Sequence, residues 1–314
     1  SEHYDAMYIG HMDTVFPDGT AEKRPFRIEG ENYYGPGVGD MKNGDLAMFH
    51  IAANLPETEK KCLNIAMVYN PDEEIGSIYS KEITDRIGCQ ADHIFVMESA
   101  GKNGTRHCFA RKGSLTYDIE FQGQAAHAGF MFEVENASAV LEMGHYIVEL
   151  MSLADREKDT TVNVGIANGG TARNVVADHA KISVEMRFRD DSERIRLKEY
   201  VNKITEGQPF VPGVKTTITM QKETPPFIKT EEAKKYIERV RKIAEEHGIP
   251  FEEKDRGGLS DANHLSRCGK AIVMDGMGPH GANDHSEKEY GYIGSVEPCV
   301  KLHLAILNDM LNKQ

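Results

Sequence analysis

Apolar and polar positions follow two different periods along the chain. In the first third and the last quarter, short apolar runs that predict buried strands are separated by segments with apolar residues at helical spacing. The expected strands are 6–10, 63–69, 93–97 and 271–274, and the expected helices are 40–54, 79–88, 231–247 and a last one ending at Leu311. Strands that alternate with helices predict a mainly parallel α/β sheet.

The middle of the chain has a different pattern, with strict alternation of apolar and polar residues in its first strand. The expected elements are, in order, strand 114–122, helix 136–153, strands 161–167 and 180–188, helix 192–205 and strand 214–220. This β-α-β-β-α-β order is typical of the ferredoxin-like split unit. We therefore expect an inserted α+β domain at 112–222 and a discontinuous α/β domain formed by 1–111 and 223–314.

The composition and net charge of the chain indicate which classes of molecule it does not bind. The chain has 314 residues, of which 39% are hydrophobic and 28% charged, and its net charge is -13. So negative a chain argues against binding to nucleic acid or to anionic lipid. No apolar run approaches the roughly 18 residues that would span a bilayer. We therefore expect no nucleic acid and no membrane among the partners.

The number and spacing of the cysteines indicate the redox state of the cellular compartment in which the protein folds. Five dispersed cysteines without CxxC spacing argue against a disulfide scaffold and favour a reducing, cytoplasmic environment. The start of the chain has no signal-peptide pattern. It begins with Ser1 rather than Met and runs almost at once into a strand, so we expect an upstream segment to be missing.

Imidazole and carboxylate side chains gather directly after the expected strands. His11 and Asp13 follow the first strand and face the same way, as suits a metal ligand and the carboxylate that orients it. Glu73 and Glu74 follow the second strand in NPDEEIGS, and Glu98 follows the third. The carboxyl ends of parallel strands are where α/β proteins bind their ligands, and adjacent carboxylates can divide metal binding and proton transfer between them.

Two loops complete the candidate chemistry. The glycines of GPGVGDMKNG fit neither GxxxxGK[ST] nor GxGxxG, so the segment is either a flexible turn or a tight loop that presents Asp40 at a helix start. His285 lies in the loop GANDHS. Two histidines and three acidic residues from five segments, without cysteine, favour zinc, manganese or cobalt. Two metals that share one bridging carboxylate would need about that many ligands.

Seven segments in order carry a family resemblance: HMDTVFP, GPGVGDMKNG, NPDEEIGS, QAAHAG, GGTARNVVADHAKISVEMRF, GGLSDAN and HSEKEY. They resemble the family of acetylornithine deacetylase, succinyl-diaminopimelate desuccinylase, aminoacylase and carboxypeptidase G, with the carboxypeptidase G (glutamate carboxypeptidase) branch most similar. The resemblance implies a zinc-peptidase catalytic domain with an inserted ferredoxin-like lid and dimerisation domain. Family members carry an additional segment of helices and strand before the HxD motif, whereas only ten residues precede it here.

The resemblance also implies two metal ions, with zinc as the first expectation and cobalt or manganese as alternatives. Asp40 would bridge both ions. His11 and Glu98 would complete the first metal site, and Glu74 and His285 the second.

Further roles are implied by the same resemblance. Asp13 would orient the first histidine ligand, and Glu73 would act as general base. His127 would reach into a neighbouring active site and support the oxyanion, although a histidine that caps a turn is the alternative.

The resemblance implies a substrate site as well. Asn174 and Arg187 would hold a substrate carboxylate, with Arg106 near the same group and Gly257 and Gly258 in a substrate loop. A surface ion pair is the alternative for Arg187.

The expected function is therefore di-metal hydrolysis of an amide bond beside a free carboxylate. The substrate would be a small peptide or an N-acyl amino acid, and a homodimer would form through residues 112–222. Three alternatives remain: an aminopeptidase or dipeptidase of the same metal chemistry, a non-catalytic metal-dependent binder of amino acids or peptides, and a structural scaffold with a vestigial site. The intact Glu73 argues against the binder, and the complete ligand set argues against the scaffold.

Overall fold

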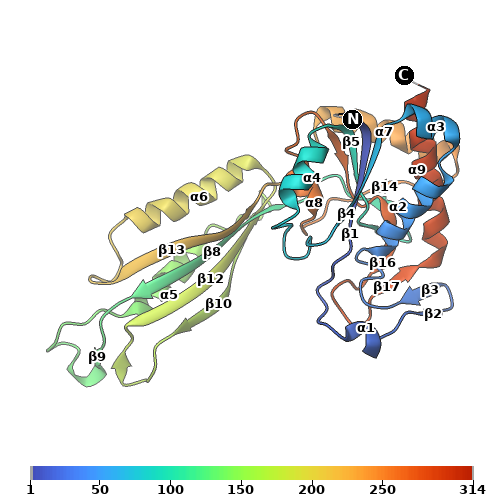
Figure 1. Ribbon diagram of the computed structural model, residues 1–314. Helices are drawn as coiled ribbons and strands as arrows, with labels where there is room; N and C mark the ends of the chain where they lie inside the picture. The colour runs from blue at the N-terminus through green and yellow to red at the C-terminus, as the bar shows by residue number, and fades with distance from the viewer. Residues whose placement is uncertain (1–2, 313–314) are drawn as a thin grey trace. The chain divides into compact units, whose positions relative to one another are not determined.

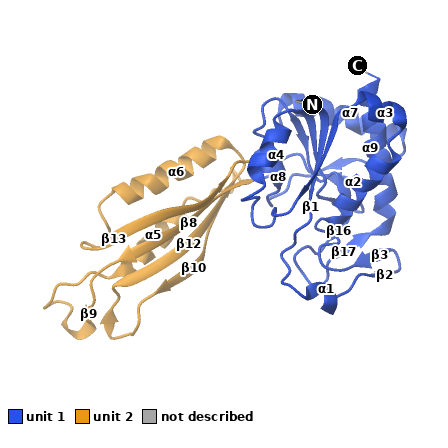
Figure 2. Ribbon diagram, in the orientation of Figure 1, with its two compact units in different colours: residues 1–111, 227–314 blue, residues 112–226 orange. Residues whose placement is uncertain are grey.

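The computed structural model describes residues 3–312 and divides the chain into two units (Figure 2). Unit 1 is formed by the chain up to Arg111 and again from Phe227, and unit 2 is Lys112–Pro226. Unit 2 thus ends four residues after the boundary expected at 222. The chain leaves and re-enters unit 1 at adjacent points, because Arg111 and Phe227 exchange two backbone hydrogen bonds of 3.0 and 3.1 Å.

Unit 1 is built on a four-stranded sheet in the order β15-β5-β1-β4 (Figure 1). Its strands are β1 (Tyr4–His11), β4 (Ile65–Asn70), β5 (Ala91–Val96) and β15 (Ile272–Met274). All three pairings are parallel. The predicted parallel sheet is therefore confirmed.

Helices cover both faces of this sheet. They are α2 (Lys42–Asn54), α3 (Glu57–Cys62), α7 (Glu231–Glu246) and α9 (Val296–Leu311) on one face, and α4 (Lys81–Gly88) and α8 (Asp261–Leu265) on the other. Successive strand residues point to opposite faces, so Tyr8 joins the first core and its neighbours Met7 and Ile9 join the second. Within residues 3–312, none of the helices is both long enough and apolar enough to cross a membrane.

A second sheet of unit 1 has the order β2-β3-β17-β16-β6 and was not predicted from the sequence. Its strands are β2 (Arg27–Glu29), β3 (Asn32–Tyr34), β6 (Ser99–Ala100), β16 (Gly278–Ala282) and β17 (Tyr290–Tyr292). These strands have two to five residues, too few for a periodic signal. The smaller elements are α1 (Thr20–Lys23), β7 (Arg106–His107), β14 (Glu252–Glu253) and the 3-10 helix η2 (Ile293–Ser295).

Unit 2 has the predicted ferredoxin-like order of elements. They are β8 (Gly113–Gln122), α5 (Ala139–Met151), β10 (Thr161–Gly169), β12 (His179–Phe188), α6 (Asp191–Glu206) and β13 (Lys215–Thr224). The sheet is antiparallel in the order β10-β12-β8-β13, and both helices share one core with it. Beyond the Gln122 end of β8 lies β9 (Ala126–His127) (Figure 1). It pairs with β11 (Val175–Val176) and is followed by the 3-10 helix η1 (Ala128–Phe130).

The core of unit 1 contains a histidine that is buried in its uncharged form. His303 on α9 is fully buried, and its Nε2–H donates to the Met277 carbonyl at 2.9 Å. Burial lowers the pKa of His303 to about 4, from an ordinary value of 6.5. Between these values the unfolded chain binds a proton that the folded chain does not, so the free energy of unfolding falls as the pH is lowered.

We expect the His303→Gln variant to lose about 3 kcal/mol of the pH dependence of unfolding between pH 7 and pH 4, because each pKa unit corresponds to about 1.4 kcal/mol. Glutamine keeps an N–H donor for Met277 but does not titrate. Urea unfolding of both proteins at the two pH values measures the difference. Equal pH dependence in variant and wild type would mean that His303 is not buried as a neutral group.

Candidate active site

Seven of the predicted site residues lie together in unit 1, at or after the carboxyl ends of β1, β4 and β5 and in loops beside them. They are His11, Asp13, Asp40, Glu73, Glu74, Glu98 and His285. Within these seven residues, two groups of three could each hold a metal ion, and both include Asp40. In each group the candidate ligand atoms lie within 4.8 Å of one another.

The carboxylate of Asp40 connects the two groups through different oxygens. Its Oδ1 lies 3.3 Å from His11 Nε2, which is also 3.5 Å from Glu98 Oε1. Its Oδ2 lies 3.1 Å from His285 Nε2, which is 3.3 Å from Glu74 Oε2. One oxygen in each group is the arrangement that a bridging carboxylate requires.

The electrostatics of the cluster suit divalent cations. Burial raises the pKa of Glu74 to about 7, with a further contribution from the charge of Asp40, and the pKa of Glu98 is raised for the same two reasons. Burial acts to lower the pKa of His11, but the neighbouring carboxylates outweigh it and the pKa is raised. Within residues 3–312, the buried Nε2 of His11 has no well-directed hydrogen bond. Excess negative charge and oxygen and imidazole donors without sulfur fit zinc, cobalt or manganese.

Asp40 is held in place by a residue that sequence reasoning missed. The backbone N–H groups of Gly37, Gly39 and Asp40 donate to the carboxylate of Glu289 at 2.9, 2.8 and 3.0 Å. Gly37 has a φ of 75°, and a Cβ on Gly39 would lie 2.9 Å from the Tyr290 carbonyl oxygen, so the loop needs glycine at both positions. Glu289 lies in HSEKEY, a segment that carries the family resemblance, but its spacing does not distinguish it from Glu287 in the same segment.

Asp13 has one contact that the sequence predicted and two that it did not. Its Oδ1 lies 3.4 Å from Nδ1 of His11, as expected for a carboxylate that orients a ligand. The same carboxylate accepts hydrogen bonds from the backbone N–H groups of Glu73 at 3.2 Å and Glu74 at 3.0 Å. Asp13 therefore connects one metal group to the loop that carries the acidic pair.

Glu73 lies beside the first group without belonging to it. Its Oε2 is 3.9 Å from Nε2 of His11. Its pKa is raised well above the usual range, first by burial and then by the negative charges of Glu98 and Asp261. A carboxylate whose pKa is raised in this way is a stronger base than an exposed glutamate, so it holds an accepted proton more firmly.

The remaining candidates in unit 1 lie outside this cluster of contacts. Nη2 of Arg106 on β7 is 3.3 Å from Oε2 of Glu252, so this guanidinium is engaged in an ion pair rather than with the seven residues above. Gly257 and Gly258 follow β14 in a loop, and the Gly258 carbonyl accepts a hydrogen bond of 3.3 Å from Nη1 of Arg111.

The candidates in unit 2 lie at two ends of its sheet. His127 pairs with Val175 in the small β9–β11 ribbon, and Ala128 N–H donates to the Asn174 carbonyl at 2.9 Å. Arg187 is near the other end of β12, where its Nη2 is 2.8 Å from Oε1 of Glu185. The eight steps of about 3.3 Å from His179 to Arg187 span roughly 26 Å, and Asn174 lies beyond the His179 end of the strand. Within one copy of unit 2, Asn174 and Arg187 therefore cannot bind the same carboxylate.

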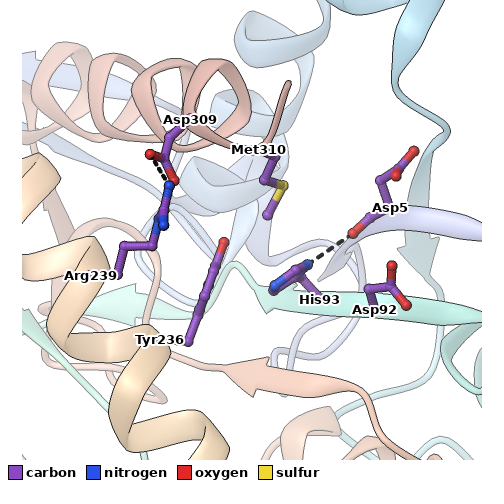
Figure 3. Close-up of a pocket in the computed structure, with 7 residues that line it drawn as sticks. All are labelled: Asp5, Asp92, His93, Tyr236, Arg239, Asp309 and Met310. Carbon is purple, nitrogen blue, oxygen red and sulfur yellow. Dashed lines mark hydrogen bonds and ion pairs between the residues drawn. The ribbon is translucent and has the colours of Figure 1, made fainter. Parts of the chain in front are cut away.

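A depression of about 270 Å³ lies at the opposite, amino ends of β1 and β5 (Figure 3). Its charged groups are largely engaged with one another. Arg239 binds the Asp309 carboxylate, and His93 Nδ1 donates to the Asp5 carbonyl at 3.1 Å. Asp92, which also lines it, lies 3.2 Å from the exposed His3. His3, Asp5 and Asp92 also form a group that could hold a metal ion, but among the described residues two such groups share a ligand only at the carboxyl ends of the strands.

Comparison with known proteins gives consistent results. The sequence profile described as Peptidase family M20/M25/M40 matches residues 7–309. Carboxypeptidase G2 of Pseudomonas sp. (strain RS-16) is 26% identical over 308 residues, which are 97% of this chain and 73% of that protein. Succinyl-diaminopimelate desuccinylase of Halorhodospira halophila is 24% identical over 97% of this chain and 82% of the relative.

Solved structures share the fold. Aminopeptidase PepT of Bacillus cereus has a TM-score of 0.77 at 23% identity, covering 99% of this chain and 82% of that one. The M20 family metallo-carboxypeptidase Sso-CP2 of Sulfolobus solfataricus has a TM-score of 0.72 at 17% identity, covering 98% of this chain and 85% of the other. At these identities the likeness concerns the fold alone.

Proposed function

The chain belongs to peptidase family M20/M25/M40, and on that premise we propose that it cleaves an amide bond beside a free carboxylate, as a glutamate carboxypeptidase or an N-acyl-amino-acid amidohydrolase does. That it is a metal-dependent hydrolase of amide bonds follows from the family. The di-metal chemistry of this proposal is carried by one observation: two candidate metal groups share Asp40, and Glu73 lies beside them. The similarity to carboxypeptidase G2 supports the choice of substrate class.

The residues present fit two divalent cations, of which zinc is our first choice and cobalt or manganese the alternatives. His11 and Glu98 would hold one cation, Glu74 and His285 the other, and Asp40 both. When bound, such cations supply positive charge that polarises a carbonyl group and lowers the pKa of a water molecule.

Proton transfer falls to Glu73. Its carboxylate takes the proton of the attacking water and then delivers it to the nitrogen of the leaving amine. The raised pKa supports the first half of this role, because the carboxylate is a stronger base and holds the proton until the second transfer. Asp13 keeps the base in place through its hydrogen bond from the Glu73 backbone.

The oxyanion would be supported by His127 from a second copy of the chain. Nδ1 of this exposed histidine accepts a hydrogen bond of 3.0 Å from the backbone of Gly129, so Nε2 carries the proton and can donate. Its position in the β9–β11 ribbon, at the end of the unit 2 sheet, supports a role for both His127 and Asn174 outside their own unit.

The surface of unit 2 supports a homodimer. Leu141 and Val148, one face of α5, are 55% and 70% exposed, and Ile166 on the edge strand β10 is 56% exposed. α5 packs on β10, so these apolar side chains and an unpaired strand edge lie on adjacent elements. Proteins ordinarily bury exposed strand edges and apolar patches of this kind. Most soluble oligomers are symmetric homo-oligomers, so a second copy of the chain is the expected partner for this surface.

The function is tested by metal analysis together with a substrate panel. The panel contains N-acyl amino acids, dipeptides with a C-terminal glutamate, and the same compounds with the carboxylate capped as an amide. We expect about two zinc-type ions per chain and release of the free amino acid from the uncapped compounds alone. Metal binding without hydrolysis of any compound would favour the binding protein, and absence of both would favour the scaffold.

We assign the binding of the substrate carboxylate to Arg187. The test replaces its guanidinium by the ammonium group of lysine. Lysine keeps the charge but loses the fork that makes two parallel hydrogen bonds to a carboxylate. We expect Arg187→Lys to lower kcat/KM for the uncapped substrate by about tenfold or more, or about 1.4 kcal/mol. Hydrolysis of the capped substrate should be no worse than in the wild type.

The matched control for this test is Arg189→Lys. Arg189 lies directly after β12, two residues from Arg187, and like Arg187 makes a side-chain ion pair, at 2.8 Å from Oδ2 of Asp159. The Arg189→Lys variant should retain the wild-type ratio of kcat/KM for the uncapped and capped substrates. If the wild type cleaves capped and uncapped compounds equally, an aminopeptidase or dipeptidase is the better assignment.

We also propose a reducing, cytoplasmic setting. All five cysteines, namely Cys62, Cys89, Cys108, Cys268 and Cys299, are free thiols, which supports a compartment in which disulfides do not form.

A further inference from the structure

We propose that Asp261 is a positioning residue that fixes the loop carrying Glu73 and Glu74; the inference rests on the function proposed for these two carboxylates. Asp261 is the first residue of α8 and is distant in sequence from the loop, which follows β4. It is not one of the candidate metal ligands.

The carboxylate of Asp261 binds both ends of the loop. Its Oδ2 accepts a hydrogen bond of 2.7 Å from Nδ2 of Asn70, where the loop begins. Its Oδ1 accepts one of 2.6 Å from Oγ of Ser77, where the loop ends. All three residues are at most 3% exposed. Buried hydrogen bonds to a charged acceptor are among the stronger ones, so this carboxylate closes the loop.

The loop between these two points is compact. Ser77 N–H donates to the Asp72 carbonyl at 2.7 Å, and Gly76 N–H donates to the Glu73 carbonyl at 2.6 Å. Glu73 and Glu74 therefore sit on a short turn whose two ends share one anchor.

The Asp261 carboxylate also accepts a hydrogen bond from His264, on α8. Its Nε2 donates to Oδ1 of Asp261 at 2.9 Å, and its Nδ1 donates to Oδ1 of Asp85 on α4 at 2.5 Å. Burial acts to lower the pKa of His264, but the two carboxylates outweigh it and raise the pKa. A positively charged imidazole between two carboxylates compensates the buried charge of Asp261.

The start of α8 is tied to the core as well. Ser260 Oγ donates to Oδ2 of Asp275 at 2.7 Å, and Asp275 forms a buried ion pair with Arg111. The position of the proposed base is thus determined partly by residues that do not touch the metal groups. Displacement of a catalytic group by about 1 Å can cost about 10²-fold in rate, so such an anchor has a large effect on turnover.

The Asp261→Asn variant breaks one specific contact. Its remaining oxygen can still accept from Ser77 and His264, but its new N–H₂ group faces that of Asn70. The double variant Asp261→Asn/Asn70→Asp restores a donor–acceptor pair with the charge moved across. Asp85→Asn is the matched control, because it removes the charge of the other partner of His264 without touching the loop.

Two readouts are needed, steady-state kinetics and hydrogen exchange of the backbone amides of residues 70–77. For Asp261→Asn we expect kcat to fall about 10- to 100-fold with KM within about twofold, and loop exchange to accelerate by about tenfold or more. The double variant should recover part of both, because Asn70→Asp restores the pair with residue 261 but loses the 3.0 Å hydrogen bond that Asn70 Nδ2 donates to Ser77 Oγ. Asp85→Asn should lower the melting temperature but keep kcat and loop exchange close to wild type.

Each outcome decides the proposal. Unchanged kcat and loop exchange in Asp261→Asn overturn it. Asp261 would have a merely structural role if two results were found together. The first is that Asp261→Asn and Asp85→Asn lose kcat equally and in proportion to their loss of melting temperature. The second is that the double variant recovers none of this kcat. If the wild type hydrolyses none of the panel, the proposed function fails, while loop exchange still decides whether Asp261 fixes the loop.

Discussion

Replacement of Glu73 by alanine is expected to lower kcat by about 10²–10⁴-fold while the metal content stays close to wild type. The reason is the position of the side chain, which is 3.9 Å from His11 but outside both candidate metal groups. Losing it removes the group that moves the proton and leaves the predicted ligands intact. Metal analysis of the dialysed variant, together with single-substrate kinetics, measures both quantities.

The neighbouring residue provides the control. Glu74→Ala should lose metal as well as activity, because Glu74 belongs to the group with Asp40 and His285. If Glu73→Ala instead loses metal and Glu74→Ala keeps it, the two roles are exchanged. Full activity in Glu73→Ala would refute the assignment of the base.

Mixing two inactive variants is expected to restore activity if His127 acts on a second copy of the chain. His127→Ala alone should cost about 10²–10³-fold, the scale of one lost oxyanion donor. In a 1:1 mixture with Glu73→Ala that has been allowed to exchange subunits, half of the dimers are mixed, and each mixed dimer has one site with both residues intact. Activity should therefore return to about a quarter of that of the wild type.

The mixture distinguishes between the two locations of His127. If this residue acts within its own chain, a mixed dimer contains no complete site and the activity stays near zero. Light scattering of the wild type at micromolar concentration is the accompanying measurement. A strictly monomeric protein would require the oxyanion role of His127 to be withdrawn.

The sequence predicted the parallel sheet because its strands are apolar runs with clear boundaries, and the candidate ligands follow those strands directly. Asp40 and His285 are in loops, and no periodic pattern indicates where such loops lie. Their approach depends on the second sheet, whose strands β16 and β17 flank the His285 loop. Strands of three to five residues with glycine carry too little pattern to be predicted.

Supporting residues were harder to predict than the candidate ligands. Glu289 and Asp261 are carboxylates in an acidic chain, and nothing in their spacing separates them from solvated side chains. Their roles depend on burial and on hydrogen bonds across 249 positions for Glu289 to Asp40 and 191 for Asp261 to Asn70. Such contacts follow from tertiary structure. For Asn174 and Arg187 the sequence predicted a proximity that is absent within unit 2. Both lie in one segment of the family resemblance, but the length of β12 separates them.

The insertion of unit 2 into unit 1 has a consequence for synthesis on the ribosome. Strands β1, β4 and β5 are made before residue 112, but their neighbour β15 and the covering helices α7 and α9 come after residue 226. At about 5–20 residues per second, the nascent chain carries these apolar strands without the cover of α7, α8 and α9 for roughly 10 s. Unit 2 is contiguous and can complete its fold within that interval. The half-made unit 1 is therefore the segment that we expect a chaperone to protect.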